Sequence, residues 1–414
     1  MSYSVNTFTD YVLLFGSSSL VGKGTLENLL DINLYIKNVS DLQGKLDSLS
    51  EIKGNVVLNK HVFCVNRRCI NEEKSFMKTI DYINMRSVTW QGGRYYLRSR
   101  KEKDTEKVPS SPNTFCYDNF EEGFIKNTPE ERGKDGYSFV YNQKQFSYTL
   151  HYACGKEKGI EIIYNFTVTQ LIIPRSETWP KLLPRIFSGT QKLEKFDIDN
   201  KNYVPGRSLP SLCDISTMVC SLGSTPARVR RTQVPSSFAD YYLPFNLAQE
   251  FTNTTNKRLV VTTAFNNDFL SKTFEYFRIK AKLENDLDEA LPNKLKELVI
   301  LRPGPMCGQH GNPINVELGK ENSTFLEKIF YYPHYLLVYK KKYISEARRI
   351  GLRTKLSEII ASSIYRMPGS ALLGYAVPVS KVSYVASLMA IERKSKEAGP
   401  KLEVINSYQI DMIV

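Results

Sequence analysis

Tyr276 and Lys280 are the residues whose types and spacing first suggest chemistry. They stand four positions apart within residues 274–290, where the spacing of apolar residues predicts a helix, so one turn separates them on the same face. A lysine ammonium beside a phenol favours the phenolate and lowers the pKa of the tyrosine, which suits the phenol to exchange a proton with a carbonyl or an alcohol. The chain has 25 tyrosines, so such pairs also arise by chance, and the position of this pair has to support the prediction.

Two threonines stand at the end of the predicted strand that comes before this helix in the chain. Thr262 and Thr263 end an apolar run, residues 258–262, that predicts a buried strand. Ligands of α/β proteins bind beyond the carboxyl ends of the strands, so a threonine hydroxyl there could orient a substrate carbonyl. The alternative stays open that these threonines only cap a turn or a helix.

A glycine-bearing loop joins the first predicted strand, residues 11–15, to a predicted helix at residues 23–30. Such a loop lets backbone N–H groups and the helix N-terminus meet the pyrophosphate of a dinucleotide, and the alternative is a plain turn. A Walker-type phosphate loop is excluded, because a glycine follows Gly22-Lys23 where serine or threonine is required. The loop residues expected to contact the pyrophosphate are Gly16, Ser19, Leu20, Val21 and Gly22.

Two arginines follow the second predicted strand, residues 61–65. A dinucleotide-binding fold places an acidic residue at this position to bind the ribose of NAD, or a basic residue to bind the 2′-phosphate of NADP. The chain has Arg67 and Arg68 there and no acidic residue, which favours NADP. The alternative is a pair of solvated arginines on a basic protein.

The elements that must position these residues alternate between strands and helices. Residues 11–65 predict a βαβ unit with parallel strands. Residues 69–166 change to aromatic and β-branched runs separated by short polar turns, with runs at 87–97, 137–141, 146–152 and 160–168 that predict hairpins. The α/β pattern then resumes, with strands expected at 171–173, 217–220, 258–262, 297–301 and 402–404, and helices at 237–251, 274–290, 344–365 and 381–393.

This pattern predicts an α/β protein with a Rossmann-like, doubly wound, mostly parallel sheet and an antiparallel β-hairpin insertion. We expect residues 1–68 to form the first part of the dinucleotide-binding domain and residues 69–166 the β-rich insertion. Residues 167–414 complete the domain and add a helical region on the substrate side.

Composition limits the partners and the compartment. The chain has 414 residues, is 42% hydrophobic, and carries 56 basic against 43 acidic residues, a net charge of +13 that favours nucleotides, anionic lipids or nucleic acid without choosing among them. The 7 cysteines are odd in number and widely spread, which indicates a reducing compartment. We expect no metal site, no signal peptide and no spanning helix, because zinc-ligand spacings are absent and the apolar runs are short.

The ordered set of motifs resembles the atypical short-chain dehydrogenase/reductases, within them the Tat-interactive-protein branch and its fungal mitochondrial outer-membrane relatives. Gly-Ser-Ser-Ser-Leu-Val-Gly at residues 16–22 is similar to the family's Gly-Ala-Thr-Gly-Leu-Val-Gly loop. Val-Asn-Arg-Arg at 65–68 resembles the end of the family's second strand, which carries an arginine. The most distinctive likeness is Cys-Ser-Leu-Gly-Ser-Thr-Pro-Ala-Arg at 220–228, which resembles the family's Cys-Leu-Gly-Thr-Thr-Arg segment.

Three further motifs continue the resemblance toward the C-terminus. Val-Val-Thr-Thr-Ala at 260–264 is similar to the family's Val-Ser-Ser-Ala strand end, residues 276–280 match its Tyr-x3-Lys, and Leu-Val-Ile-Leu-Arg-Pro-Gly at 298–304 contains its Leu-Arg-Pro-Gly run. The likeness spans residues 12–65 with gaps, 171–311, and more faintly residues 373 onward. The hairpin insertion has no counterpart in the family.

The resemblance implies roles for individual residues. Tyr276 would be the catalytic acid, Lys280 would bind the nicotinamide ribose and tune Tyr276, and Thr262 or Thr263 would replace the substrate-orienting serine. Leu222 and Gly223 would pass close to the cofactor. The chain departs from the family where Ser19 replaces the middle glycine, because a side chain there enters the space that the pyrophosphate approaches.

Two interpretations of function follow. In the first, the protein binds NADP(H) and passes hydride to or from a carbonyl or alcohol substrate. In the second, it is a catalytically silent Rossmann-fold scaffold that binds a protein, a membrane surface or RNA through its insertion and a basic segment at residues 339–355. That segment either holds the protein reversibly on a membrane, by resemblance the mitochondrial outer membrane, or is a solvated helix face of a protein in the cytoplasm. The oligomeric state stays open.

Overall fold

The computed structural model describes the chain in separate ranges: residues 6–30, 56–67, 95–98, 116–125, 139–152, 160–173, 175–190, 192–197, 202–224, 229, 234–253, 257–290, 295–307, 374–391 and 401–413. The helices expected at 344–365, the basic segment at 339–355 and Arg68 lie outside these ranges.

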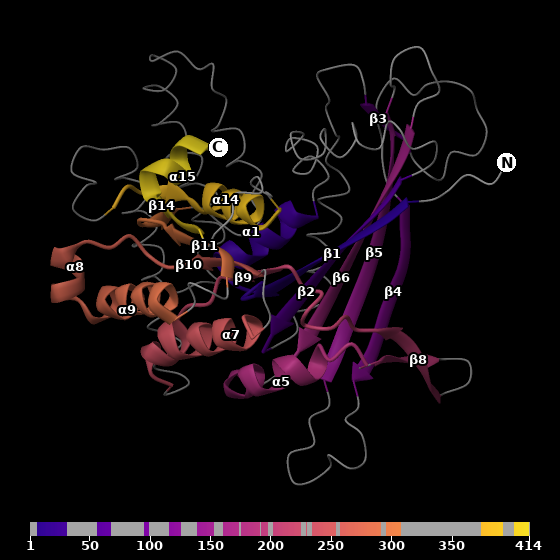
Figure 1. Ribbon diagram of the computed structural model, residues 1–414, viewed down its shortest axis with the longest axis horizontal. Coiled ribbons are helices and arrows are strands. Elements are labelled where there is room, and N and C mark those ends of the chain that lie inside the picture. Colours follow the sequence, from indigo (N-terminus) through magenta and orange to yellow (C-terminus); the bar gives the residue numbers. More distant parts are fainter. Residues whose placement is uncertain are drawn as a thin grey trace, which may run out of the picture.

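Strands and helices alternate along most of the described chain (Figure 1). The strands are β1 Asn6–Phe15, β2 Val56–Asn66, β3 Tyr95–Arg98, β4 Cys116–Ile125, β5 Phe139–Tyr152, β6 Ile160–Ile172, β7 Lys192–Asp197, β8 Asn202–Ser208, β9 Thr217–Cys220, β10 Lys257–Thr262, β11 Leu295–Arg302, β12 Met306–Cys307, β13 Val377–Pro378 and β14 Lys401–Asn406. The helices are α1 Leu20–Leu29, η2 Ser176–Thr178, α5 Trp179–Ile186, η3 Phe238–Tyr242, α7 Leu243–Phe251, α8 Asp268–Thr273, α9 Glu275–Ala290, α14 Val379–Ile391 and α15 Ser407–Ile413.

The parallel part of the sheet has the doubly wound strand order. Strands β6, β2, β1, β9, β10, β11 and β14 are neighbours in that order, and each neighbouring pair is parallel. Counted along the chain, this is the third, second, first, fourth, fifth, sixth and seventh parallel strand, which is the Rossmann arrangement with its change of direction between β1 and β9. The predicted Rossmann-like fold is confirmed.

The hairpin strands continue the same sheet beyond β6. Strand β5 pairs antiparallel with β6 from Val140 opposite Ile172 to Tyr152 opposite Ile160, and β4, β7 and β8 follow in order. The separate strands expected at 160–168 and 171–173 are one strand, β6, because parallel pairing with β2 and antiparallel pairing with β5 both extend along its length. The expected end of the insertion at residue 166 therefore falls inside β6.

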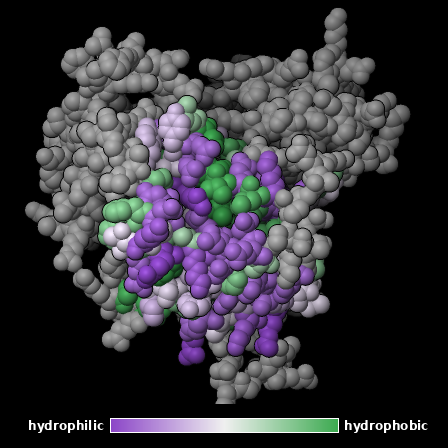
Figure 2. Space-filling model, turned by 60° about the vertical axis from the view of Figure 1, so that its left-hand side comes forward, coloured by the Kyte–Doolittle hydropathy of each residue, from purple (hydrophilic) through white to green (hydrophobic). Residues whose placement is uncertain are grey.

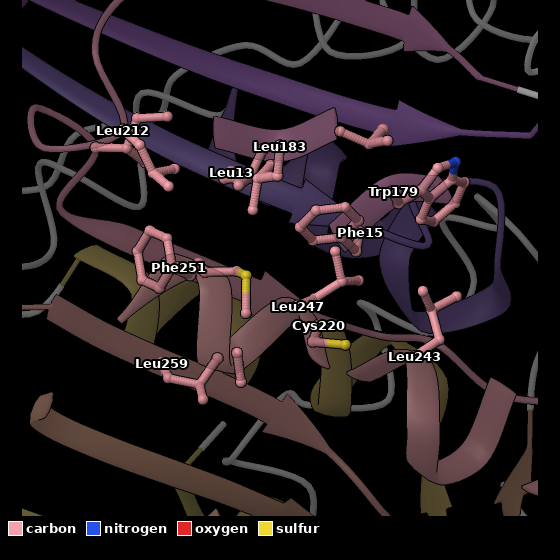
Figure 3. Packing of buried hydrophobic residues seen from close by; sticks show 14 of the residues in the cluster. Leu13, Phe15, Trp179, Leu183, Leu212, Cys220, Leu243, Leu247, Phe251 and Leu259 are labelled. Carbon is pink, nitrogen blue, oxygen red and sulfur yellow. The ribbon is translucent and has the colours of Figure 1, made fainter. Parts of the chain in front are cut away.

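Helices cover both faces of the parallel sheet, as expected for buried strands. On one face, α1 and α14 pack against side chains such as Val62 and Val260. On the other, α5, α7 and α9 pack against side chains such as Leu13 and Leu259. Figure 3 shows this second core, with Trp179 of α5 and Phe251 of α7 packed around the strands.

Helix α14 lies unusually close to α1. The hydroxyl of Ser383 donates to Val21 O at 3.0 Å, and the hydroxyl of Ser387 donates to Thr25 O at 3.1 Å. A Cβ on Gly24 would lie 2.6 Å from Ser383 Oγ, so the glycine is needed for this approach. Helix α14 therefore holds the first helix, α1, in place.

Gln170 is fully buried in β6, and among the residues that the structure describes neither its amide nitrogen nor its amide oxygen has a hydrogen-bond partner. Since burying unsatisfied polar atoms is costly, we expect Gln170→Leu to raise the free energy of unfolding by about 1–3 kcal/mol, measured by urea denaturation. In the control Asn165→Leu on the same strand, stability should fall, because Asn165 donates to Asn59 Oδ1 at 3.0 Å. A loss of stability in Gln170→Leu would contradict the prediction.

Candidate functional site

The glycines of the first loop allow close backbone packing at the carboxyl edge of the sheet. Gly16 has φ +81°, and a Cβ there would lie 2.6 Å from Ser221 O, just beyond β9. A Cβ on Gly22 would lie 2.1 Å from Gly16 O. Both glycines are therefore required where a dinucleotide-binding fold brings its loop toward a pyrophosphate.

Ser19 is the N-cap of α1. Its Oγ accepts a hydrogen bond from Gly22 N at 3.0 Å, and its own N–H donates to Gly16 O at 2.7 Å. The serine side chain thus satisfies one of the N–H groups at the helix start. The first N–H groups of an α-helix, here those of Leu20 and Val21, have no acceptor within the helix and stay available to an anion.

Asn66, the last residue of β2, is buried beside this loop. Its Oδ1 accepts from Ser17 Oγ at 2.9 Å, while its Nδ2 has no hydrogen-bond partner within the described residues. Arg67 follows it and is half-buried at the end of the strand. Arg67, which the sequence predicts as a site residue, therefore follows a buried amide donor, Asn66. The interpretation of the sequence did not select Asn66.

Lys280 is buried in α9 and reaches the loop that follows β9. Its Nζ lies 3.0 Å from Asp240 Oδ1 and donates to Leu222 O at 3.5 Å. Asp240, in η3, also accepts from Ser224 N at 3.2 Å and from the Ser224 hydroxyl. Gly223 belongs to the same group, because a Cβ there would lie 3.5 Å from Asp240 Oδ1. The structure thus brings Lys280, Leu222 and Gly223 together.

Tyr276 stands one turn before Lys280 and is 41% exposed, with its ring packed edge-on against Phe277. The protein around its hydroxyl desolvates the phenol and raises the pKa of Tyr276; the Lys280 ammonium lowers this pKa by a smaller amount, and the Asp240 carboxylate raises it further. The expectation that the pKa of Tyr276 is lowered is therefore wrong, because desolvation and Asp240 outweigh the lysine.

The two threonines at the end of β10 face opposite sides of the sheet. Val260 belongs to the core under α14 and Val261 to the core under α9, so strand alternation places Thr262 on the α14 side and Thr263 on the α9 side. The Thr263 hydroxyl donates to Glu284 on α9, whose other carboxylate oxygen pairs with Arg302 at 2.5 Å. Thr263 therefore shares a side with Lys280 but is bonded within the protein.

A row of unsatisfied polar atoms marks the carboxyl edge of the sheet. Asn66 Nδ2 at the end of β2, Ser221 Oγ after β9 and Thr262 Oγ1 at the end of β10 are buried and have no hydrogen-bond partner within the described residues. Buried donors and hydroxyls are rarely left unpaired, so these atoms indicate a polar ligand or ordered water along this edge. Together with the glycine loop they fit a dinucleotide cofactor.

Sequence reasoning did not select Asn66, Ser221 or Asp240. Asn66 and Ser221 stand at strand ends, which is a signal that could have identified them. Asp240 gave no signal, because it lies in a segment interpreted only as a helix and meets Lys280 across a long separation in the chain. The described surface on the side of α8 and α9 is mostly hydrophilic, with smaller hydrophobic areas between the hydrophilic ones (Figure 2). Within the described ranges, no helix has the length and apolar character needed to cross a bilayer.

Comparison with known proteins gives a family and two distant structures. A family model described as HIM1 matches residues 168–336. The chain is 99% identical to Protein HIM1 of Saccharomyces cerevisiae over 414 residues, 100% of both chains. YwfH, an NADPH-dependent reductase involved in bacilysin biosynthesis, is 8% identical with a TM-score of 0.34, covering 97% of this chain and 99% of that one.

The second distant structure is Pen from Bacillus thuringiensis. It is 11% identical with a TM-score of 0.29, and the match covers 76% of this chain and 56% of that chain. Both TM-scores are low, so the assignment of the fold rests on the strand order described above.

Proposed function

The chain belongs to the HIM1 family, and from the geometry of its sheet edge we propose that it binds NADP(H) and passes hydride between the nicotinamide and a carbonyl or alcohol, as short-chain dehydrogenase/reductases do. The observation that carries the proposal is the position of Lys280. This buried ammonium contacts Leu222 O and the Asp240 carboxylate directly beyond β9, and the neighbouring residue Ser221 packs against the glycine loop at Gly16.

Each part of the edge has a role in this proposal. The glycine loop and the N–H groups of Leu20 and Val21 would hold the pyrophosphate, while Arg67 and the amide of Asn66 would bind the adenosine side. NADPH, when bound, supplies the hydride. Lys280 would hold the nicotinamide ribose beside Leu222 and Gly223, and Tyr276, one turn away, would donate the proton to the carbonyl oxygen.

A second candidate function is a silent Rossmann-fold scaffold. Two contacts favour it. The Ser19 hydroxyl caps α1 and the Thr263 hydroxyl is bound to Glu284, so both hydroxyls are engaged within the protein itself. In that case the partner would be a protein, an anionic membrane or a nucleic acid, and the basic segment at residues 339–355 would bind it. Association with the mitochondrial outer membrane belongs to the same proposal.

Cofactor preference tests the proposal. NADPH should bind roughly 10- to 100-fold more tightly than NADH, because an arginine pairs with the 2′-phosphate through charge-assisted hydrogen bonds. Arg67→Asp should remove or reverse this preference in titrations followed by nicotinamide fluorescence. The matched control is Arg185→Asp, an exposed arginine on α5, which should keep it. If neither cofactor binds at millimolar concentration, the scaffold function is favoured.

A further inference from the structure

Asp240 lies at the meeting point of three elements of the candidate site. It is fully buried in η3, a turn of π-helix, which is a form often found at functional sites. One carboxylate oxygen contacts Lys280 on α9 and the backbone N–H of Ser224, and the other accepts from the Ser224 hydroxyl. The carboxylate therefore fixes the β9 loop and the lysine to each other.

Within the described part of the chain, the charges around Lys280 are few and close. Its side chain and that of Asp240 are 2% and 1% exposed, so solvent screens their attraction little. Cys220 on β9 also faces the ammonium, but burial raises its pKa to about 11 and it stays a neutral thiol. The next acid on this face of α9, Glu284, is paired with Arg302. Asp240 is thus the charge that compensates Lys280.

We propose that Asp240 is a positioning residue that holds the Lys280 ammonium on the β9 loop and compensates its charge, so that Tyr276 keeps the proton that reduction of a carbonyl requires. The inference rests on the proposed function for the role of Tyr276 as proton donor. The contacts of Asp240 do not depend on it.

The protonation state of Tyr276 decides which direction of a reversible reaction the free enzyme is ready to start. Reduction of a carbonyl needs a protonated phenol that can donate to the developing alkoxide, whereas oxidation of an alcohol needs a phenolate that can accept a proton. A lysine without a counter-charge would favour the phenolate. The raised pKa of Tyr276, to which Asp240 contributes, agrees with the protonated form at neutral pH.

The test is the ionisation of Tyr276 in the full-length protein without cofactor. The near-ultraviolet absorbance of phenolate is followed against pH in the wild type and in each variant. The same titration is repeated with Tyr276→Phe added to each protein, and the difference between the two curves is the ionisation of Tyr276. In Asp240→Asn, which keeps the shape and the acceptor oxygen, the midpoint should fall by roughly one pH unit, because the ammonium then acts on the phenol uncompensated. Asp240→Glu should keep it high.

The matched control is Asp286→Asn. Asp286 is a carboxylate on α9 that accepts from the Tyr241 hydroxyl of η3, so its loss perturbs the same pair of helices without touching Lys280. It should leave the Tyr276 midpoint unchanged. An unchanged midpoint in Asp240→Asn would overturn the proposal.

The wild-type protein alone gives an independent result if Asp240→Asn does not fold. A wild-type midpoint below that of an ordinary tyrosine would overturn the proposal, because Lys280 would then act on Tyr276 in spite of Asp240. NADPH binding is measured separately. A protein with the predicted titration but no NADPH affinity would refute the proposed function and leave the relation between Asp240 and Lys280 standing.

Discussion

Gly22→Ala is expected to abolish NADPH binding and to lower the free energy of unfolding by about 3 kcal/mol, the upper end for an overpacked site. A Cβ at position 22 would lie 2.1 Å from Gly16 O and 2.6 Å from Gly16 C, which are backbone atoms with little freedom to move. The loop must open to accommodate the methyl group, and it then loses its approach to Ser221. Urea denaturation and a fluorescence titration with NADPH measure the two effects.

A neighbouring glycine supplies the control. A Cβ on Gly24 would lie 2.6 Å from Ser383 Oγ and 2.8 Å from Ser383 Cβ, which are side-chain atoms and not backbone. Gly24→Ala should therefore cost less stability, and Ser383→Ala should recover part of the loss, while NADPH affinity stays near that of the wild type. If Gly22→Ala bound NADPH normally, the loop would not be the pyrophosphate site.

Tyr276→Phe is expected to lower the turnover of a carbonyl substrate by roughly 10²- to 10⁴-fold, the usual contribution of a general acid. Affinity for NADPH should change little, because the substitution removes one hydroxyl from a side chain that is 41% exposed. The measurement is the rate of NADPH oxidation with a panel of carbonyl compounds, compared with direct titration of the cofactor.

Two further variants separate catalysis from folding. Lys280→Ala should weaken both turnover and NADPH binding, because it removes the contact with the β9 loop and leaves Asp240 buried without its cation. Tyr242→Phe changes another exposed tyrosine close to the site and should be neutral. A substrate turned over by Tyr276→Phe at the wild-type rate would show that the proton comes from another group.

The fold could be predicted because its signals are local. Apolar runs such as residues 258–262 and 297–301 predict buried parallel strands, and the strands lie there with a residue or two added at their ends. The glycine loop was predictable for the same reason. Its two glycines let the backbone pack closely within the loop and against the end of the neighbouring strand. The order of strand, loop and helix is visible in the sequence.

The contacts that decide the chemistry are not local. Asp240 and Lys280 lie on different helices, and only the fold brings them within 3.0 Å. The sequence therefore predicted a lysine acting on Tyr276, and it missed the carboxylate that compensates that lysine. Ser19 shows the opposite case, because its role as the N-cap of α1 is local. A serine that accepts from the N–H three residues later is a common helix start, but the resemblance to a glycine motif concealed this role.

The hydrogen bonds between α14 and α1 have a consequence for the order of events during synthesis. Ser383 and Val21 are separated by 362 positions, so the contact joins the two ends of the chain. While the ribosome is still translating the middle of the message, the apolar side of α1, with Val21, Leu26 and Leu29, has no partner among the described helices that precede α14. Such high contact order slows folding and leaves the unfinished chain dependent on chaperones. A premature stop codon ahead of residue 379 should therefore yield a protein that is degraded, rather than a shorter one that retains its first strands.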